Sequence, residues 1–277
     1  FLHFLARQTE LRVLSISDKM NVFIDSEEKD TFDLAAILPK LPNLVKLKLM
    51  VSNIPASAMV RLKNALEHCP TIKKVKLEGV FGGFSMIPSQ SNINDLFLRF
   101  CGMSKQYPAL FDQLAQWPHL AHLSLTNQQG PPQFPLLPHL TSLLLCSYDR
   151  KTPTIDFSTT LTSLELGSFV LNSTLATDIS KLKLTTLRIT ATKTRLLLDQ
   201  LPSTLTLLEL VDVQLTDSEL VETCQSWPTS LQRLDVARSK LLGEDTGRAL
   251  AAMLPNWPHL EELVLPSPAL VPEMESA

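Results

Sequence analysis

The stretch WPHLAHLSL at residues 117–125 returns near the other end of the chain as WPHLEELVL at residues 257–265. Both stretches contain the pattern L-x-x-L-x-L, and this pattern occurs eleven times with Leu, Ile or Val in its three fixed places. The copies begin at Leu11, Leu44, Ile72, Ile93, Leu120, Leu140, Leu161, Leu184, Leu205, Leu231 and Leu260. Successive copies start 20 to 33 residues apart, which is the period of an internal repeat.

The second and third apolar residues of each copy are two positions apart, as Leu123 and Leu125 are. This alternation indicates a short strand with one buried face. A strand of about five residues cannot bury that face alone, so neighbouring copies must stack side by side. The sequence therefore predicts an α/β solenoid, a curved horseshoe with a parallel β-sheet on its concave face and helices and irregular turns on its convex face.

An apolar residue followed by Pro precedes seven of the copies. Pro disfavours helix at the residue before it and donates no backbone hydrogen bond, so we expect it to end the preceding helix or turn and to start the chain extended. The apolar residue is predicted to pack beneath the sheet. These residues are Leu41, Cys69, Trp117, Leu137, Leu201, Trp227 and Trp257.

The spacers between copies differ in what they can form. The long ones predict helices at residues 55–68, 104–116, 216–226 and 243–254. Thr216 and Glu219 have the spacing of a capping box at the start of the third helix. The short spacers predict turns or 3₁₀ segments instead, as does the Pro-rich stretch TNQQGPPQFPLLP.

Composition excludes several classes of protein. In 277 residues with 44% hydrophobic content, no apolar run approaches the roughly 20 residues of a membrane span. The four cysteines have no metal-ligand spacing and indicate reduced thiols of an intracellular protein, cytoplasmic or nuclear. A net charge of −3 indicates no nucleic-acid or membrane partner. The start of the chain lacks Met and a signal peptide, so we expect a piece of a longer protein.

Catalytic and cofactor motifs are also missing from the sequence. The glycine-rich stretch GVFGGFSMIP at 79–88 lacks the Lys and hydroxyl residue of a phosphate loop. His119 and His122 are three apart, which on a strand places them on opposite faces and disfavours a shared metal. We therefore expect no catalytic residues, no cofactor and no metal.

The stretches HCPTIKKVKL, TCQSWPTSLQRLDV and LTDSELVETC resemble leucine-rich repeats of the ribonuclease-inhibitor-like and F-box types. The resemblance covers the chain from about Leu11 to Leu265. It departs from the family at the eighth residue after each copy's start, where the family prefers Asn or Cys and only Cys101 agrees. We expect one leucine-rich-repeat domain of about eleven irregular repeats at residues 1–265, and a C-terminal tail at 266–277.

The resemblance further implies a function. It implies the substrate-recognition repeats of a ubiquitin-ligase receptor, with an F-box upstream of residue 1 that binds a Skp1-like adaptor. The alternatives are a leucine-rich-repeat scaffold or sensor with no ubiquitin link, and a GTPase-activating repeat protein. In the first two readings the repeats are a protein-protein interaction module, and we expect no enzyme; the third belongs to a different class, whose catalytic Arg the sequence does not place.

The predicted partner-binding surface is the concave face, which positions 2, 4 and 6 after each copy's first residue would form. Its candidate residues are Lys46, Lys48, Lys74, Lys76, Phe97, Arg99, His122, Leu144, Arg188, Leu207 and Arg233. Leu144, Leu207 and Val211 are expected to be exposed, as apolar contacts for a partner or as plain repeat degeneracy.

Charge is uneven along the repeats. Residues 41–105 carry nine Lys or Arg against three Asp or Glu, and residues 205–277 carry four against twelve. On neighbouring strands, Lys46 is predicted to lie beside Lys74 and Lys48 beside Lys76. The four lysines then either bind an acidic or phosphorylated peptide or form a solvated face.

Overall fold

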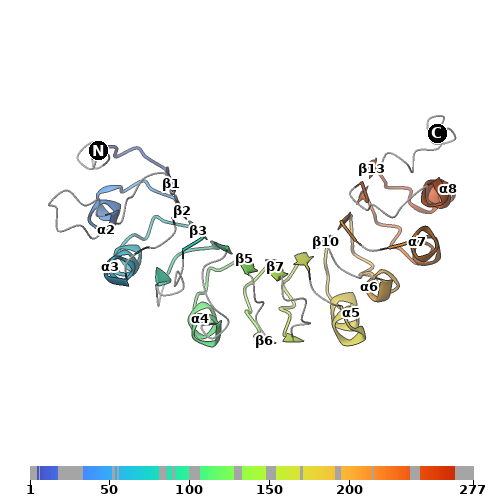
Figure 1. The fold of residues 1–277 in the computed structure, drawn as a ribbon, viewed down its shortest axis with the longest axis horizontal. Helices are drawn as coiled ribbons and strands as arrows, with labels where there is room; N and C mark the ends of the chain where they lie inside the picture. Colours follow the sequence, from blue (N-terminus) through green and yellow to red (C-terminus); the bar gives the residue numbers. More distant parts are fainter. Residues whose placement is uncertain are drawn as a thin grey trace. The chain divides into compact units, whose positions relative to one another are not determined.

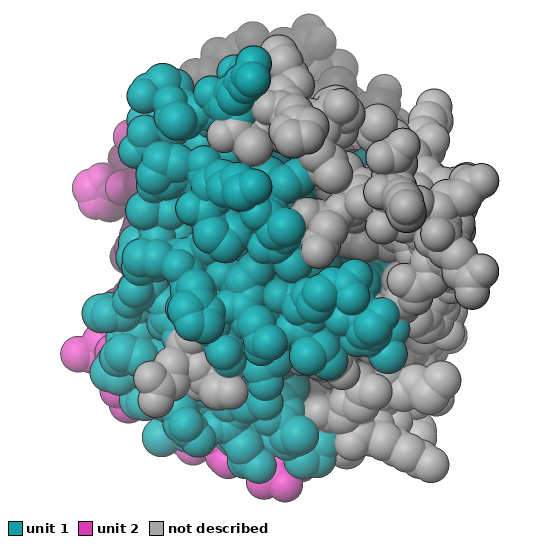
Figure 2. All heavy atoms as spheres, turned by 90° about the vertical axis from the view of Figure 1, so that its left-hand side faces the viewer, with its two compact units in different colours: residues 1–131, 135–140 teal, residues 132–134, 141–277 magenta. Residues whose placement is uncertain are grey.

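The computed structural model describes most of the chain. The described residues are 5, 7–17, 34–51, 54, 56–80, 86–88, 91–99, 107–127, 133–147, 154–168, 171–190, 195–213, 215–237 and 244–265. Within them the fold is α/β, and eleven strands follow one another in chain order in one sheet. The structure divides into two compact units, Phe1–Pro131 with Pro135–Leu140 and Pro132–Phe134 with Thr141–Ala277 (Figure 2, teal and magenta).

Unit 1 contains five strands of the sheet, each paired in parallel with the next. Its strands are β1 (Val13–Ser17), β2 (Lys46–Met50), β3 (Lys74–Glu78), β4 (Asp95–Arg99) and β5 (His122–Asn127). Its helices are α2 (Leu34–Ile37), the 3₁₀ helix η1 (Leu38–Lys40), α3 (Ala56–Glu67) and α4 (Tyr107–Leu114). Helices α2, α3 and α4 lie on one side of the strands (Figure 1).

Unit 2 contains six strands of the sheet, again paired in parallel, and one short separate pair. The six are β7 (Ser142–Ser147), β9 (Ser163–Gly167), β10 (Thr186–Thr190), β11 (Leu207–Val211), β12 (Arg233–Asp235) and β13 (Glu262–Val264). The separate pair is β6 (Gln133–Phe134) and β8 (Thr154–Ile155). The helices are α5 (Ser173–Ser180), α6 (Arg195–Leu198), α7 (Asp217–Cys224), α8 (Glu244–Met253) and the 3₁₀ helix η4 (Leu254–Asn256).

Each of the eleven strands starts two residues after the first residue of a motif copy, as the sequence predicts. The two apolar residues of each strand are at most 7% exposed in every copy but the last. In that last copy, Leu263 and Leu265 are only half-buried. Alternating burial therefore fixes which strand residues face the core, and the register prediction is confirmed.

The apolar-Pro pair lies at a β-turn and does not lead straight into the strand. The apolar residue is the first residue of the turn in five copies, and the Pro is the first residue in the copies at Leu205 and Leu231. The N–H of Leu120 donates to the carbonyl oxygen of Trp117 at 3.4 Å, and that of Leu260 donates to Trp257 at 3.0 Å. Pro118 thus holds the second position of a turn, which its fixed φ favours. Six of the seven apolar residues are buried, as predicted, and Leu201 is half-buried. The indole rings of Trp227 and Trp257 stack with centroids 5.9 Å apart.

The four helices predicted in long spacers are present as α3, α4, α7 and α8. The capping box is confirmed, because the N–H of Glu219 donates to Thr216 Oγ1 at 3.4 Å and the N–H of Thr216 donates to Glu219 Oε2 at 3.0 Å. Between α7 and α8, the hydroxyl of the fully buried Thr246 donates to the carboxylate of Asp217. Packing of these two helices therefore includes a buried polar contact.

The expectation of turns alone in short spacers was wrong. Helix α5 occupies a short spacer, where Asn172 Oδ1 accepts from the N–H of Leu175 at 2.8 Å and so caps its start. Leu175, Ala176 and Ile179 bury one face of it. The Pro-rich stretch likewise contributes β6, which pairs with β8, and Phe134 on β6 is 1% exposed. A cap and a buried face suffice for two helical turns even in a short connection.

Threonine hydroxyls add a second ladder to unit 2. Thr162, Thr185 and Thr206 each precede a strand, and each hydroxyl donates to the carbonyl oxygen of the equivalent residue one copy earlier. These distances are 3.2, 3.2 and 3.0 Å. The hydroxyls reinforce the strand register from the edge where the strands begin.

A matched pair of substitutions on β9 tests the register. Leu164 is fully buried, so Leu164→Asp would bury a carboxylate and should lower the free energy of unfolding by several kcal/mol, on the order of 3 or more. Ser163→Asp, one residue earlier and half-exposed, should change it by less than about 0.5 kcal/mol. Chemical denaturation of both variants measures the difference, and equal effects would contradict the assigned faces.

Candidate protein-binding surface

The first, third and fifth residues of each strand form one side of the sheet, which we call the polar face. Every predicted site residue lies on it. Lys46, Lys74 and His122 are exposed, and the other eight residues are half-buried. The strand register places the lysines opposite one another as predicted, Lys46 beside Lys74 and Lys48 beside Lys76.

The polar face of unit 1 carries five basic residues against two acidic ones. Asp95 Oδ2 lies 3.2 Å from Lys74 Nζ. Glu78 contacts two cations, Lys76 Nζ at 3.4 Å and Arg99 Nη1 at 3.1 Å. Lys74 and Lys76 are therefore partly neutralised by the protein itself, which sequence reasoning did not predict.

Phe97 lies in the same row as Lys48 and Lys76 and is half-buried. Lys76 Nζ sits 4.1 Å from the centroid of the Phe97 ring, which is a cation–π contact. The ammonium of Lys76 is thus held between an aromatic ring and the Glu78 carboxylate. Phe97 is the one aromatic residue on the polar face of the described strands of unit 1.

The polar face of unit 2 has the opposite balance, with four acidic residues against two arginines. Arg188 Nε lies 3.2 Å from Glu209 Oε2 and 3.7 Å from Glu165 Oε1. Arg233 lies 3.9 Å from Glu209, which links the two arginines. It also contacts Asp235 at 3.6 Å and Glu262 at 2.8 Å.

These residues form a network of alternating charge across five neighbouring strands, β9 to β13. Such pairs are half-exposed and individually worth about 0.2 to 1 kcal/mol. Because each arginine is shared, the network holds several side chains in one arrangement. Both Arg188 and Arg233 are therefore already paired with carboxylates of the protein itself.

The apolar residues of the polar face in unit 2 are less exposed than the sequence suggests. Leu144 and Leu207 are half-buried, and Val211 is buried at 7% exposure, so the prediction that Val211 is exposed was wrong. The residue after it, Asp212, has φ of 51°, a left-handed conformation that Asp tolerates. Strand β11 therefore ends at Val211, and the backbone turns at Asp212.

Gly167 shows how closely the strands approach. A Cβ added to Gly167 would lie 2.7 Å from Cys146 Sγ and 3.2 Å from Cys146 Cβ on the neighbouring strand β7. The thiol of Cys146 occupies the space above the glycine. This pair is a local packing constraint on the polar face that the motif pattern did not reveal.

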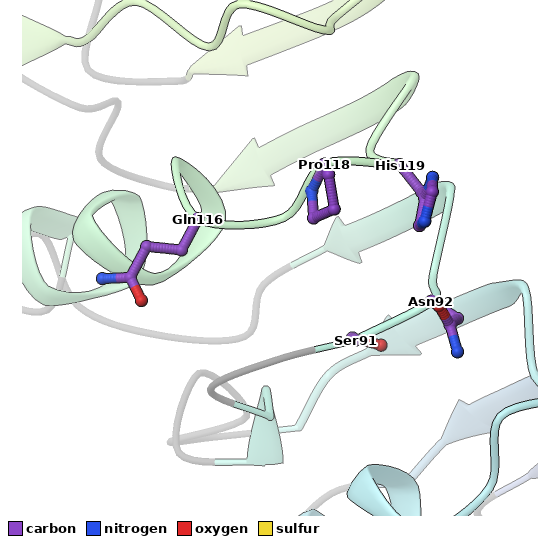
Figure 3. A pocket seen from close by; sticks show the side chains of 5 residues that line it. All are labelled: Ser91, Asn92, Gln116, Pro118 and His119. Atoms are coloured by element: carbon purple, nitrogen blue, oxygen red, sulfur yellow. The ribbon is translucent and has the colours of Figure 1, made fainter.

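A hollow of about 390 Å³ lies in unit 1 where β4 and β5 begin. The lining residues are Ser91, Asn92, Gln116, Pro118 and His119 (Figure 3). The side chains of His119 and Asn92 lie at one end of it and that of Gln116 at the other. His119 is in the turn before β5 and not on a strand, so the opposite-face argument for His119 and His122 was wrong.

Metal and membrane features are assessed for the described residues only. Among them, no group of three or more His, Cys, Asp or Glu is arranged to hold a metal ion. In the same part of the chain, no helix has both the length and the apolarity that crossing a bilayer requires. Burial raises the pKa of the Cys69 and Cys224 thiols, which favours their neutral form.

No protein-family model matches the chain, and no curated protein matches it either.

Glu165 gives a pH-dependent prediction. Burial raises the pKa of its carboxyl above the ordinary 4.5, the Arg188 charge opposes that effect, and the Glu209 charge adds to it. The folded state then binds the proton more tightly than the unfolded state, so this group lowers stability as pH rises from about 4.5 through the raised pKa. Glu165→Gln should therefore gain stability relative to the parent between pH 4 and 7. Chemical denaturation of the parent and the variant at pH 4 and at pH 7 measures this gain. A difference in unfolding free energy that is the same at both pH values would contradict the raised pKa.

A double-mutant cycle tests the packing of Gly167. Gly167→Ala should lower the free energy of unfolding by about 1 to 3 kcal/mol, because the new methyl group would overlap Cys146 Sγ. Cys146→Ala removes that atom and should recover a substantial part of the loss in the double variant. Strict additivity of the two changes would show that the thiol is not the obstacle.

Proposed function

We propose that the chain is a leucine-rich-repeat solenoid whose polar face binds protein, and that it forms the substrate-recognition repeats of an F-box-like ubiquitin-ligase receptor. The observation that carries the binding part is the strict register of the strands. Each strand adds two or three side chains to the polar face, and apart from Gly167 and Val211 those that the structure describes are half-buried or exposed. Repeat proteins use such extended surfaces for recognition.

The chemistry of this face suits a protein partner better than a small molecule. A specific protein interface buries about 800 Å² on each partner and is therefore extended over many residues, as a face built from successive strands is. The polar face of unit 1 combines charged side chains with Phe97, and that of unit 2 combines them with Leu144 and Leu207; each mixture is typical of interfaces. In the proposal the bound protein is the target, while catalysis and any cofactor belong to other subunits.

The ligase part of the proposal rests on the resemblance of the repeats to F-box proteins. It requires an F-box outside these 277 residues, and through it a Skp1-like adaptor. In this arrangement the repeats themselves bind neither nucleic acid nor membrane.

Affinity purification tests both parts. Full-length protein and residues 1–277 serve as bait, and bound chains are identified by mass spectrometry. Recovery of a Skp1-like adaptor with the full-length protein alone is the expected result. Proteins retained by residues 1–277 without any adaptor in the longer form would instead favour a scaffold or sensor. Stimulation of a small GTPase by the repeats would favour the GTPase-activating alternative.

Two double variants test whether the polar face of unit 2 binds the partner protein. Ser163→Arg with Thr186→Arg places two bulky charges on the polar face of unit 2 and should reduce partner recovery at least tenfold. Thr159→Arg with Gln225→Arg makes the same change at exposed sites off that face and should not. Equal recovery by both variants, with intact folding, would exclude the polar face of unit 2.

A further inference from the structure

Two lysines on the polar face of unit 1, Lys46 and Lys48, have no acidic side chain paired with them among the described residues. For Lys46 and Lys48, no ion pair or side-chain hydrogen bond is found within the part of the chain that the structure describes. On one side they face the neutral Val13 and Ser15 of β1. On the other side they face Lys74 and Lys76, about 5 Å away across the strands. Positive charge therefore accumulates along β2.

The same face shows which group relieves such charge. Lys74 and Lys76 are each contacted by a carboxylate, from Asp95 at 3.2 Å and from Glu78 at 3.4 Å. Both carboxylates come from the polar face itself, so the geometry of the sheet admits an acidic side chain beside a lysine. The two lysines of β2 lack this partner among the described residues. A carboxylate supplied by another molecule would complete the same pattern.

An apolar contact lies on the same row. Lys48, Lys76 and Phe97 occupy equivalent positions on β2, β3 and β4. Because neighbouring strands are about 4.8 Å apart, Lys48 and Phe97 are roughly 10 Å apart along the row. Phe97 is half-buried, and the Lys76 ammonium, which also pairs with Glu78, lies 4.1 Å from the centroid of the ring. A partner side chain that reaches the ring would meet an aromatic surface flanked by a neutralised charge.

We propose that the polar face of unit 1 binds a segment of a partner protein in which an acidic residue precedes an apolar residue by three positions. The acidic side chain pairs with Lys46 and Lys48, and the apolar side chain packs on Phe97. A polyproline II segment returns to the same side every three residues and advances about 9 Å in doing so, which matches the separation on the sheet. The inference rests on the proposed function, because it names the class of protein segment that the binding module takes.

A direct titration tests the inference with the 277-residue chain. The probe is a fluorescein-labelled synthetic peptide, Gly-Glu-Pro-Pro-Leu-Gly, followed by fluorescence anisotropy. Peptides with Gln for Glu, Ser for Leu, or one Pro removed are the comparison probes. The parent peptide should bind at least threefold more tightly than each of them, and its affinity should fall as salt concentration rises.

Two protein variants locate the binding. Lys46→Gln with Lys48→Gln should weaken binding about fivefold and reduce its salt dependence, because the ion pairs of both lysines with the peptide's Glu are lost. Lys40→Gln with Lys63→Gln removes the same charge from η1 and α3 on the helix side of unit 1 and should change affinity less than twofold. Phe97→Ala should abolish the preference for Leu over Ser. Thermal unfolding confirms that each variant is folded.

Several results would overturn the inference. They are equal binding of the Glu and Gln peptides, equal loss in the two lysine variants, or tighter binding of a single-stranded RNA of matched charge. These results leave the proposed function intact if a partner protein is still lost with Ser163→Arg and Thr186→Arg. Failure of the full-length protein to retain any partner through the polar face would instead defeat the proposed function itself.

Discussion

The burial of two apolar side chains per strand is the constraint on which the rest of the structure depends. A strand of five residues offers too little apolar surface to fold alone, so each copy is stable only against its neighbours. Leu47 and Leu49, with a strand on either side, are fully buried, whereas Leu263 on the last strand and Leu265 directly after it are half-buried. Alternation then leaves the intervening side chains on the polar face. The candidate binding surface is therefore a by-product of how the core is closed.

The strands could be predicted from sequence because their signal is local and repeated. Every L-x-x-L-x-L copy produced a strand at the expected residue, and the Thr216 cap was visible as two residues at a fixed spacing. The short spacers were harder, since helix α5 depends on the cap at Asn172 and on what its buried face meets. Strands β6 and β8 depend on each other across two copies. Pairing of that kind leaves no periodic pattern in either segment.

The sequence predicted which residues lie on the polar face, but it did not predict how their charged side chains pair with one another. Counting along each strand places Lys74 and Arg188 on the polar face, and the structure agrees. The pairing of Lys74 with Asp95, and the sharing of Arg188 between Glu165 and Glu209, depend on register between copies separated by spacers of different length. Once the strand register is known, opposite charges at equivalent positions could have suggested these pairs. The burial of Val211 and the left-handed backbone of Asp212 after it are likewise features that the motif does not encode.

Because a β-turn precedes most strands, the residue at which a strand begins does not depend on the length of the spacer before it. In these copies the carbonyl oxygen of a turn residue accepts the N–H of the first motif residue, as Trp117 does for Leu120. The spacers before the turns range widely in length and contain helices, 3₁₀ turns or short strands. The strand nevertheless begins at the same motif position each time. Insertions and deletions in a spacer can thus accumulate without moving any residue of the sheet, so the helix side of the protein can diversify while the polar face keeps its geometry.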